Sequence, residues 1–159
     1  MDQLLTLSRL DAGDDLEKQS VHWQGIVQQA VVDQYASAQA AGVELALDAP
    51  ATPVLQHGNP LLLALLVRNL LDNAIRYSPP GSEVWLKLEP GCLQVLDSGP
   101  GVSPEALVRI GERFYRPPGQ QQSGSGLGLS IVHHIAHLHG MTVAMNNRAE
   151  GGFAVTIKL

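Results

Sequence analysis

The sequence predicts an α/β two-layer sandwich, in which a mixed, mostly antiparallel sheet of about five strands packs against three helices. Three segments repeat apolar residues at helical spacing, and five shorter segments have the apolar patterns of strands. The predicted strands come in neighbouring pairs and do not alternate strictly with helices, which favours a mixed sheet over a parallel one. A length of 159 residues, 45% of them hydrophobic, fits one globular domain.

Each of the three predicted helices has a recognisable start or stop. The first ends at Gly42, a residue type favoured just after a helix. Its apolar stripe comprises Ile26, Val27, Ala30, Val31, Gln34, Tyr35 and Ala38. The second spans about 60–77, with Asn59 as N-cap and Pro60 at the first helical position. The third opens near Gly126 and stops at Gly140. Its apolar side carries Leu129, Val132, Ile135, Ala136 and His139.

The predicted strands fill the gaps between these helices. Residues 43–48 and 84–89 alternate apolar and polar side chains, and residues 93–96 form a short apolar run after the turn at Pro90-Gly91. Residues 141–145 alternate in the same way and pair with 153–157 across a turn. A sheet of about five strands follows.

Three other segments have weaker patterns. Leucines at helical spacing within residues 4–10 precede a polar stretch, as at the end of a helix whose partners are missing. A short helix is expected over 104–113, capped by Ser103. Residues 117–124, rich in Pro, Gly and Gln, have the composition of a mobile loop.

Composition and charge narrow the classes of function. A net charge of −5 without a basic run disfavours nucleic-acid binding. The single cysteine, Cys92, excludes an internal disulfide and a cysteine-based zinc site. The apolar run 61–67 is far shorter than the roughly 20 residues that cross a membrane, and no signal peptide is recognisable, so a soluble chain is expected.

A first candidate motif lies on the second predicted helix. Asn69 and Asn73 are four residues apart and share one helical face, and Arg76 and Tyr77 follow one turn later. Two amide oxygens and a cation suit a polyphosphate with Mg²⁺, which prefers oxygen ligands. The alternative interpretation is a polar helix face with two solvated asparagines.

A second motif follows the apolar strand 93–96. Asp97 stands at the strand end, and Gly99 and Gly101 allow close approach of the backbone to a flat ligand. A carboxylate only accepts hydrogen bonds, so it suits the amino group of adenine. The alternative is an ordinary Asp-x-Gly turn.

The third motif is a glycine-rich run over 124–130 that leads into a helix. Glycines before a helix N-terminus present backbone N–H groups and the positive end of the helix dipole to an anion. The spacing fits neither the P-loop nor the dinucleotide-binding fingerprint, yet it suits phosphate. The alternative, a flexible linker, is weakened by Leu127 and Leu129, which require burial.

Together these motifs resemble the catalytic, ATP-binding domain of bacterial sensor histidine kinases. Residues 69–77 are similar to the N box of that family, 97–101 to its G1 box, 113–116 to its F box and 124–129 to its G2 box. The resemblance covers about residues 17–159. Within the family, the segments 61–79 and 110–120 are most similar to quorum-sensing sensor kinases.

The resemblance implies the Bergerat ATP-binding fold and a set of site residues. It assigns Mg²⁺ and the phosphates to Asn69 and Asn73, the adenine amino group to Asp97, and a lid to residues 113–125. Catalytic roles fall to Asn69 and to Arg116, a candidate for contact with the γ-phosphate. The other implied ATP-binding residues are Arg76, Tyr77, Gly99, Gly101, Arg113, Phe114, Gly124, Gly126, Leu127, Gly128 and Leu129.

Asn69 also bears on the choice between a kinase and an ATPase. Related ATPases carry a water-activating Glu at this position, whereas an amide is no general base. The resemblance therefore implies transfer of the γ-phosphate of ATP to a histidine on a dimerisation domain, and from there to an Asp of a response regulator. A nucleotide-dependent regulatory module without phosphotransfer and a Bergerat-type ATPase stay open as alternatives.

The implied phosphoacceptor histidine is missing from the chain. Neither His22 nor His57 has the expected sequence context, and the other four histidines lie on the third predicted helix, where a solvated surface is favoured over a metal site. These four are His133, His134, His137 and His139. Residues 1–13 are thus expected to be the C-terminal stub of the dimerisation and phosphoacceptor helix, and 17–159 the catalytic domain. The resemblance implies a cytoplasmic domain of an inner-membrane protein, without direct membrane contact of its own, and a monomer when isolated.

Overall fold

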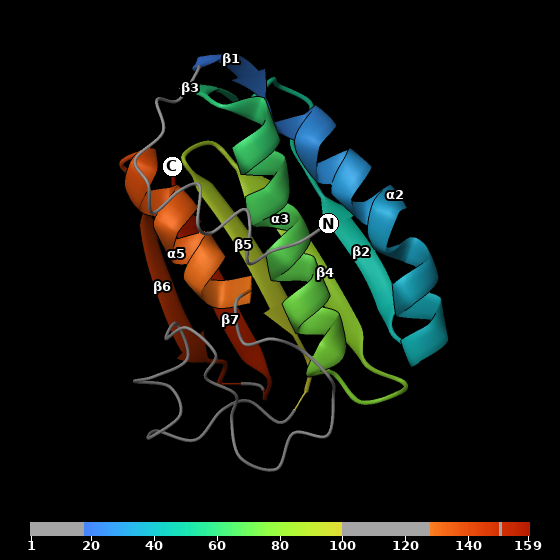
Figure 1. Ribbon diagram of the computed structural model, residues 1–159. Coiled ribbons are helices and arrows are strands. Elements are labelled where there is room, and N and C mark those ends of the chain that lie inside the picture. The colour runs from blue at the N-terminus through green and yellow to red at the C-terminus, as the bar shows by residue number, and fades with distance from the viewer. Residues whose placement is uncertain (1–17, 100–127, 150) are drawn as a thin grey trace.

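The computed structural model describes residues 18–99, 128–149 and 151–159 (Figure 1). The predicted helical stub at 1–13, the short helix at 104–113 and the loop at 117–124 lie outside these residues. The elements in chain order are β1 (Gln19–His22), α2 (Trp23–Ala41), β2 (Glu44–Asp48), β3 (Leu55–Gly58), α3 (Pro60–Arg76), β4 (Glu83–Glu89), β5 (Cys92–Asp97), α5 (Gly128–Leu138), β6 (Thr142–Asn147) and β7 (Phe153–Lys158).

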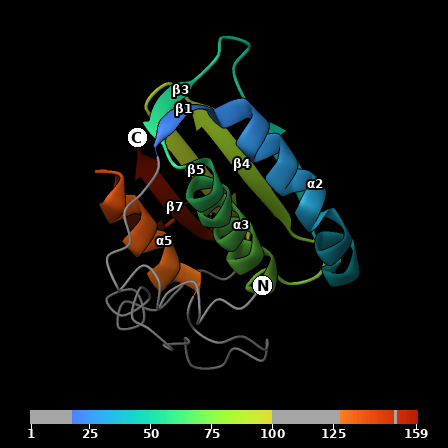
Figure 2. The same ribbon diagram turned by 45° about the horizontal axis from the view of Figure 1, so that its top comes forward.

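The main sheet has five strands in the order β2-β4-β5-β7-β6. β2 runs parallel to β4, and the other neighbouring pairs are antiparallel. α2, α3 and α5 lie side by side over one face of this sheet (Figure 2). The predicted two-layer sandwich with a mixed, mostly antiparallel sheet on three helices is therefore confirmed.

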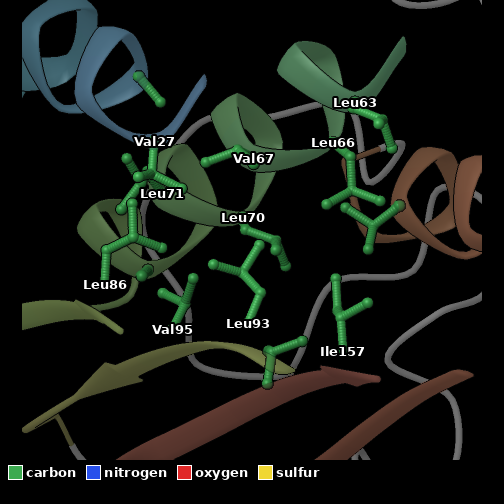
Figure 3. Packing of buried hydrophobic residues seen from close by; sticks show 14 of the residues in the cluster. Val27, Leu63, Leu66, Val67, Leu70, Leu71, Leu86, Leu93, Val95 and Ile157 are labelled. Carbon is green, nitrogen blue, oxygen red and sulfur yellow. The ribbon is translucent and has the colours of Figure 1, made fainter. Parts of the chain in front are cut away.

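α3 is the middle helix of the helical layer, and it begins where the sequence predicted, after the N-cap Asn59. The side chain of Asn59 accepts hydrogen bonds from the backbone N–H groups of Leu61 and Leu62, and Pro60 occupies the first turn. Leu63, Leu66 and Leu70 are almost fully buried, and in Figure 3 they point toward the sheet and toward α5. The helix that carries the first motif is therefore held along its length by the core.

The strands bury one face because successive side chains point to opposite sides. In β5, Leu93 and Val95 are buried beneath the helices, whereas Leu96 is half-buried on the other side. Residues 93–96, which the sequence predicts as a short apolar run, thus alternate between buried and half-buried side chains. Asp97 has the same parity as Leu93 and Val95, so it turns to the helix-covered side of the sheet.

The structure adds a two-stranded sheet that the sequence pattern did not predict. β1 and β3 pair antiparallel, with Val21 opposite Gln56. It also defines the start of the first helix, for which the sequence pattern gave none, and corrects its apolar stripe. α2 begins at Trp23, whose side chain is fully buried and donates to Gln56, whereas Tyr35 is 56% exposed and lies off the buried stripe.

None of the helices described here combines the length and the apolar character that a membrane span requires.

Candidate functional site

The three motif-bearing elements converge at one end of the molecule. The C-terminal end of α3, the C-terminal end of β5 and the first turn of α5 lie at the same end (Figure 1). The fold therefore joins residues that are up to about sixty positions apart in the sequence. This end is the candidate site.

Asp97 is buried at this end of the molecule, and backbone hydrogen bonds fix its carboxylate. It is 5% exposed, and its Oδ1 accepts hydrogen bonds from the backbone N–H of Gly99 at 2.9 Å and of Phe153 at 3.1 Å. Both bonds converge on one oxygen, so Oδ2 is the atom that can accept from a ligand. The carboxylate is positioned by the backbone of two segments and needs no partner side chain to orient it.

Glycines surround Asp97 because the backbone approaches it closely. A Cβ at Gly152 would overlap the Asp97 carbonyl oxygen, and the φ of Gly152 is +96°. A Cβ at Gly99 would lie 3.1 Å from the Tyr77 carbonyl oxygen and 3.3 Å from Asp97 Oδ1. These contacts explain why glycine follows the carboxylate, and they place Tyr77 beside the same turn.

Arg148 holds the outer side of the Asp97 backbone. Its guanidinium donates to the Asp97 carbonyl oxygen at 2.9 Å and lies over the Trp85 ring at 5.1 Å from the ring centre. Burial raises the pKa of the Asp97 carboxyl, and the hydrogen bonds from Gly99 and Phe153 and the charge of Arg148 oppose that rise. Desolvation is the larger effect, so the site holds an acceptor that water solvates poorly.

Asn69 and Asn73 take different environments on α3. Asn69 is 2% exposed and donates from Nδ2 to the Leu65 carbonyl at 2.8 Å, which fixes the orientation of its amide. Asn73 is half-buried one turn later, and its side chain makes no hydrogen bond to a residue that the structure describes. The interpretation of both as solvated amides is wrong for Asn69.

Arg76 and Tyr77 stand at the C-terminal end of α3. Arg76 forms an ion pair with Asp72 at 2.9 Å, and Tyr77 is the C-cap residue. Arg76 and Asn69 also line a polar pocket of about 250 Å³ between α2 and α3, which Asn73, Tyr77 and Asp97 do not line. This pocket therefore brings together only two of the predicted site residues and does not by itself outline the site.

Of the third motif, the structure describes only the residues from Gly128 onward, where the helix begins. α5 begins at Gly128, and Leu129 is 5% exposed, as its predicted burial requires. The N-terminus of α5 and the positive end of its dipole lie at the same end of the molecule as the C-terminal end of β5, which Asp97 terminates (Figure 1). The other predicted site residues lie outside the described part of the chain: Gly101, Arg113, Phe114, Arg116, Gly124, Gly126 and Leu127.

The structure adds contributors that the motifs did not reveal. Gly152, Phe153 and Arg148 support Asp97 from a segment more than fifty residues away. The pair Gly151-Gly152 before a predicted strand was the available signal. His139 is half-buried and accepts a backbone hydrogen bond, which agrees with its predicted place on the apolar side of the third helix and not with a solvated histidine surface.

Comparison with known proteins agrees with this geometry. A family model described as histidine kinase-, DNA gyrase B-, and HSP90-like ATPase matches residues 58–159, more than half of the chain. Sensor protein QseC of Salmonella typhi is 56% identical over 159 residues, which cover 99% of this chain and 35% of that protein. This chain thus spans about a third of the length of the curated relatives that it matches.

Solved structures give the same result. The cytoplasmic segment of histidine kinase QseC matches with a TM-score of 0.72 and 39% identity, covering 98% of this chain and 82% of that one. Full-length ShkA in complex with AMPPNP matches with a TM-score of 0.77 and 26% identity, covering 98% of this chain and 34% of that one. The resemblance predicted from the four motifs, and within it the similarity to QseC, is confirmed.

Proposed function

Because this chain belongs to the family of histidine kinase-, DNA gyrase B- and HSP90-like ATPase domains, we propose that it is the ATP-binding catalytic domain of a two-component sensor histidine kinase. Residues 17–159 form the domain, and residues 1–13 are the end of the dimerisation and phosphoacceptor helix. The phosphoryl group passes from ATP to a histidine of that dimerisation domain and then to an Asp of a response regulator.

The observation that carries the proposal is the arrangement at Asp97. Its Oδ1 is occupied by two backbone N–H groups at 2.9 and 3.1 Å, which directs Oδ2 to an external donor. The 6-amino group of adenine is such a donor. The buried carboxylate therefore selects a base that carries an amino group.

The phosphates belong to the other two motifs. Asn73 and Asn69 would supply amide oxygens for Mg²⁺, and the backbone N–H groups at the start of α5 would bind the phosphates. Among the described residues the donor set is hard and oxygen-rich, which fits Mg²⁺. When bound, Mg²⁺ would neutralise phosphate charge; Arg76 and Arg116 would add positive charge from the protein.

Asn69 favours transfer to histidine over hydrolysis. Its amide is buried and hydrogen-bonded to the Leu65 carbonyl, and an amide cannot take a proton from water. The domain therefore positions the nucleotide, and the dimerisation domain supplies the nucleophile. Its partners are that domain and the cognate response regulator, and its location is the cytoplasmic side of an inner membrane.

Calorimetric titration of the chain with ADP and AMPPNP, with and without Mg²⁺, tests the proposal. Binding is expected, and Asp97→Asn should weaken it on the order of 100-fold, since the variant keeps an oxygen for Gly99 and Phe153 but turns an NH₂ group toward the adenine amino group. GDP, whose base presents a carbonyl at that position, serves as the matched ligand and should bind Asp97→Asn better than ADP does.

Two results would contradict the proposal. Absence of nucleotide binding by the folded wild-type chain would remove the ATP site. Brisk steady-state phosphate release from ATP would favour an ATPase, and binding without transfer to an added dimerisation domain would favour a regulatory module.

A further inference from the structure

His139 links the two helices that carry the phosphate-binding motifs, at the end of the molecule opposite to Asp97. It directly follows α5, and its Nε2 lies 3.1 Å from the backbone nitrogen of Asn59, the N-cap of α3. Its Nδ1 lies 2.8 Å from the Ile135 carbonyl oxygen, one turn back in α5. One ring therefore connects the end of α5 to the beginning of α3.

The hydrogen bonds determine which nitrogen of the ring carries the proton. The Asn59 N–H can only donate, so Nε2 must accept, and the proton resides on Nδ1, which donates to the Ile135 carbonyl. The same Asn59 accepts from Leu61 and Leu62 through its side chain. The neutral ring thus fixes the residue that caps α3.

The chain leaves space for this ring by having glycine at position 58. A Cβ at Gly58 would lie 3.0 Å from His139 Cδ2, 3.2 Å from Nε2 and 2.8 Å from the Leu63 side chain. Leu63 in turn lies beside α5 in the core (Figure 3). Packing and hydrogen bonding at this corner therefore involve the same few residues, which we call the α3–α5 corner: Gly58, Asn59, Leu63, Ile135 and His139.

We propose that His139 is a positioning residue, which through Asn59 sets the placement of α3 against α5 and thereby the spacing between the Asn73 amide and the N-terminus of α5. α3 is a continuous helix from Pro60 to Arg76 that is packed against the core, so a displacement of its first turn is carried to its last. The inference rests on the proposed function only in assuming that the spacing between Asn73 and the N-terminus of α5 affects nucleotide binding. The contacts of the α3–α5 corner do not depend on that assumption.

Protonation of the ring is incompatible with the corner. A charged imidazole donates from both nitrogens, so its Nε2–H would face the Asn59 N–H. Burial lowers the pKa of His139, the Ile135 hydrogen bond opposes this, and the charge of Lys18 lowers it further. Of the residues described here, Lys18 donates to the Leu138 carbonyl, His57 is exposed next to Gly58, and the first turn of α3 has no acidic residue that would favour the charged ring.

NMR of the ring nitrogens tests the corner without a nucleotide. We expect a neutral His139 with its proton on Nδ1 at pH 7.5 and a pKa below the ordinary value of a histidine side chain. A proton on Nε2, or a pKa at or above the ordinary histidine value, would overturn the proposed hydrogen bond whether or not the chain binds ATP.

Titration with Mg²⁺ and ADP at pH 7.5 and 5.5 then tests the coupling. The affinity of the wild-type chain should fall by at least about fivefold more than that of His139→Gln, whose amide oxygen accepts from Asn59 but does not titrate. His137→Gln, on the same helix, should behave as the wild type does. By linkage, ADP should also lower the pKa of His139 in the wild-type chain.

Equal pH dependence of the wild type and His139→Gln, with the predicted ring tautomer present, would overturn the positioning role. Since Asp97 and the phosphates titrate in all three proteins, their contribution cancels in the comparison. Failure of every protein to bind ADP at pH 7.5 would contradict the proposed function and the coupling, while the tautomer measurement would still decide the corner.

Discussion

The two ends of the helical layer show two different uses of a buried titratable side chain. At one end Asp97 accepts two backbone hydrogen bonds through Oδ1 and has a second acceptor atom in Oδ2. At the other end His139 has both nitrogens engaged, with Asn59 and Ile135. The first arrangement can bind a ligand and the second can only join segments of the chain. A buried side chain can bind a ligand only if it keeps an acceptor atom that the backbone does not already use. Asp97 keeps one and His139 does not.

At each end a glycine is packed against the titratable side chain or its backbone, and the largest expected effect is a loss of stability when such a glycine is replaced. Gly152→Ala should destabilise the fold by about 3 kcal/mol or more, because a Cβ would overlap the Asp97 carbonyl oxygen in addition to the strain of a positive φ. Gly151→Ala is the matched control, since its φ is +98° with no atom within 4 Å. Urea denaturation of both variants measures the difference, and equal losses would contradict the contact with Asp97.

Gly58→Ala tests the opposite end and should cost about 1–3 kcal/mol through contacts with Leu63 and His139. The loss should shrink when His139→Ala is present, which a double-mutant cycle in urea measures. Gly25→Ala, in an exposed first turn of α2 with no atom within 4 Å, should instead raise stability by about 0.5–1 kcal/mol. Additive losses at Gly58 and His139 would show that the ring does not restrict position 58.

The smallest expected effect concerns the pH dependence of stability, in which the two ends act with opposite signs. The raised pKa of Asp97 adds stability as pH falls through its folded value toward 3.8, and the lowered pKa of His139 removes stability as pH falls below 6.5. Between pH 7.5 and 4, a range that reaches down to the ordinary pKa of an aspartate, Asp97→Asn should therefore lose more stability than the wild type, and His139→Gln should lose less. Urea midpoints at both pH values check this, and parallel changes in all three proteins would contradict it.

The sequence predicted best what is encoded locally. Asn59 and Pro60 marked the start of α3, and alternation marked β4 and β7, because capping and strand periodicity depend on near neighbours. β1 and β3 were missed, since each has four residues and Val21 is the only buried hydrophobic residue of β1. Short strands of that kind exist through their partner.

The site followed the same division. Asp97 and Gly99 were predicted from their position after a strand, but the N–H of Phe153, which completes the cradle, comes from 56 residues away. His139 was predicted on the third helix and lies directly after it, yet its role depends on Asn59, 80 residues earlier. A local pattern places a side chain on an element but does not reveal which distant backbone group it will meet.

The register between β5 and β7 has a consequence for how the site forms during folding. β4–β5 and β6–β7 are pairs of adjacent strands, whereas β5–β7 aligns Leu96 with Ala154 and closes a long stretch of chain. Because β5 and β7 are far apart in the sequence, their pairing requires closure of a long loop, which lowers the entropy of the chain before the contacts form. The β5–β7 pairing is therefore expected to form late in folding. Asp97 receives one hydrogen bond from its own turn and one across that pairing. Nucleotide binding would then report, in a refolding experiment, the docking of the last hairpin.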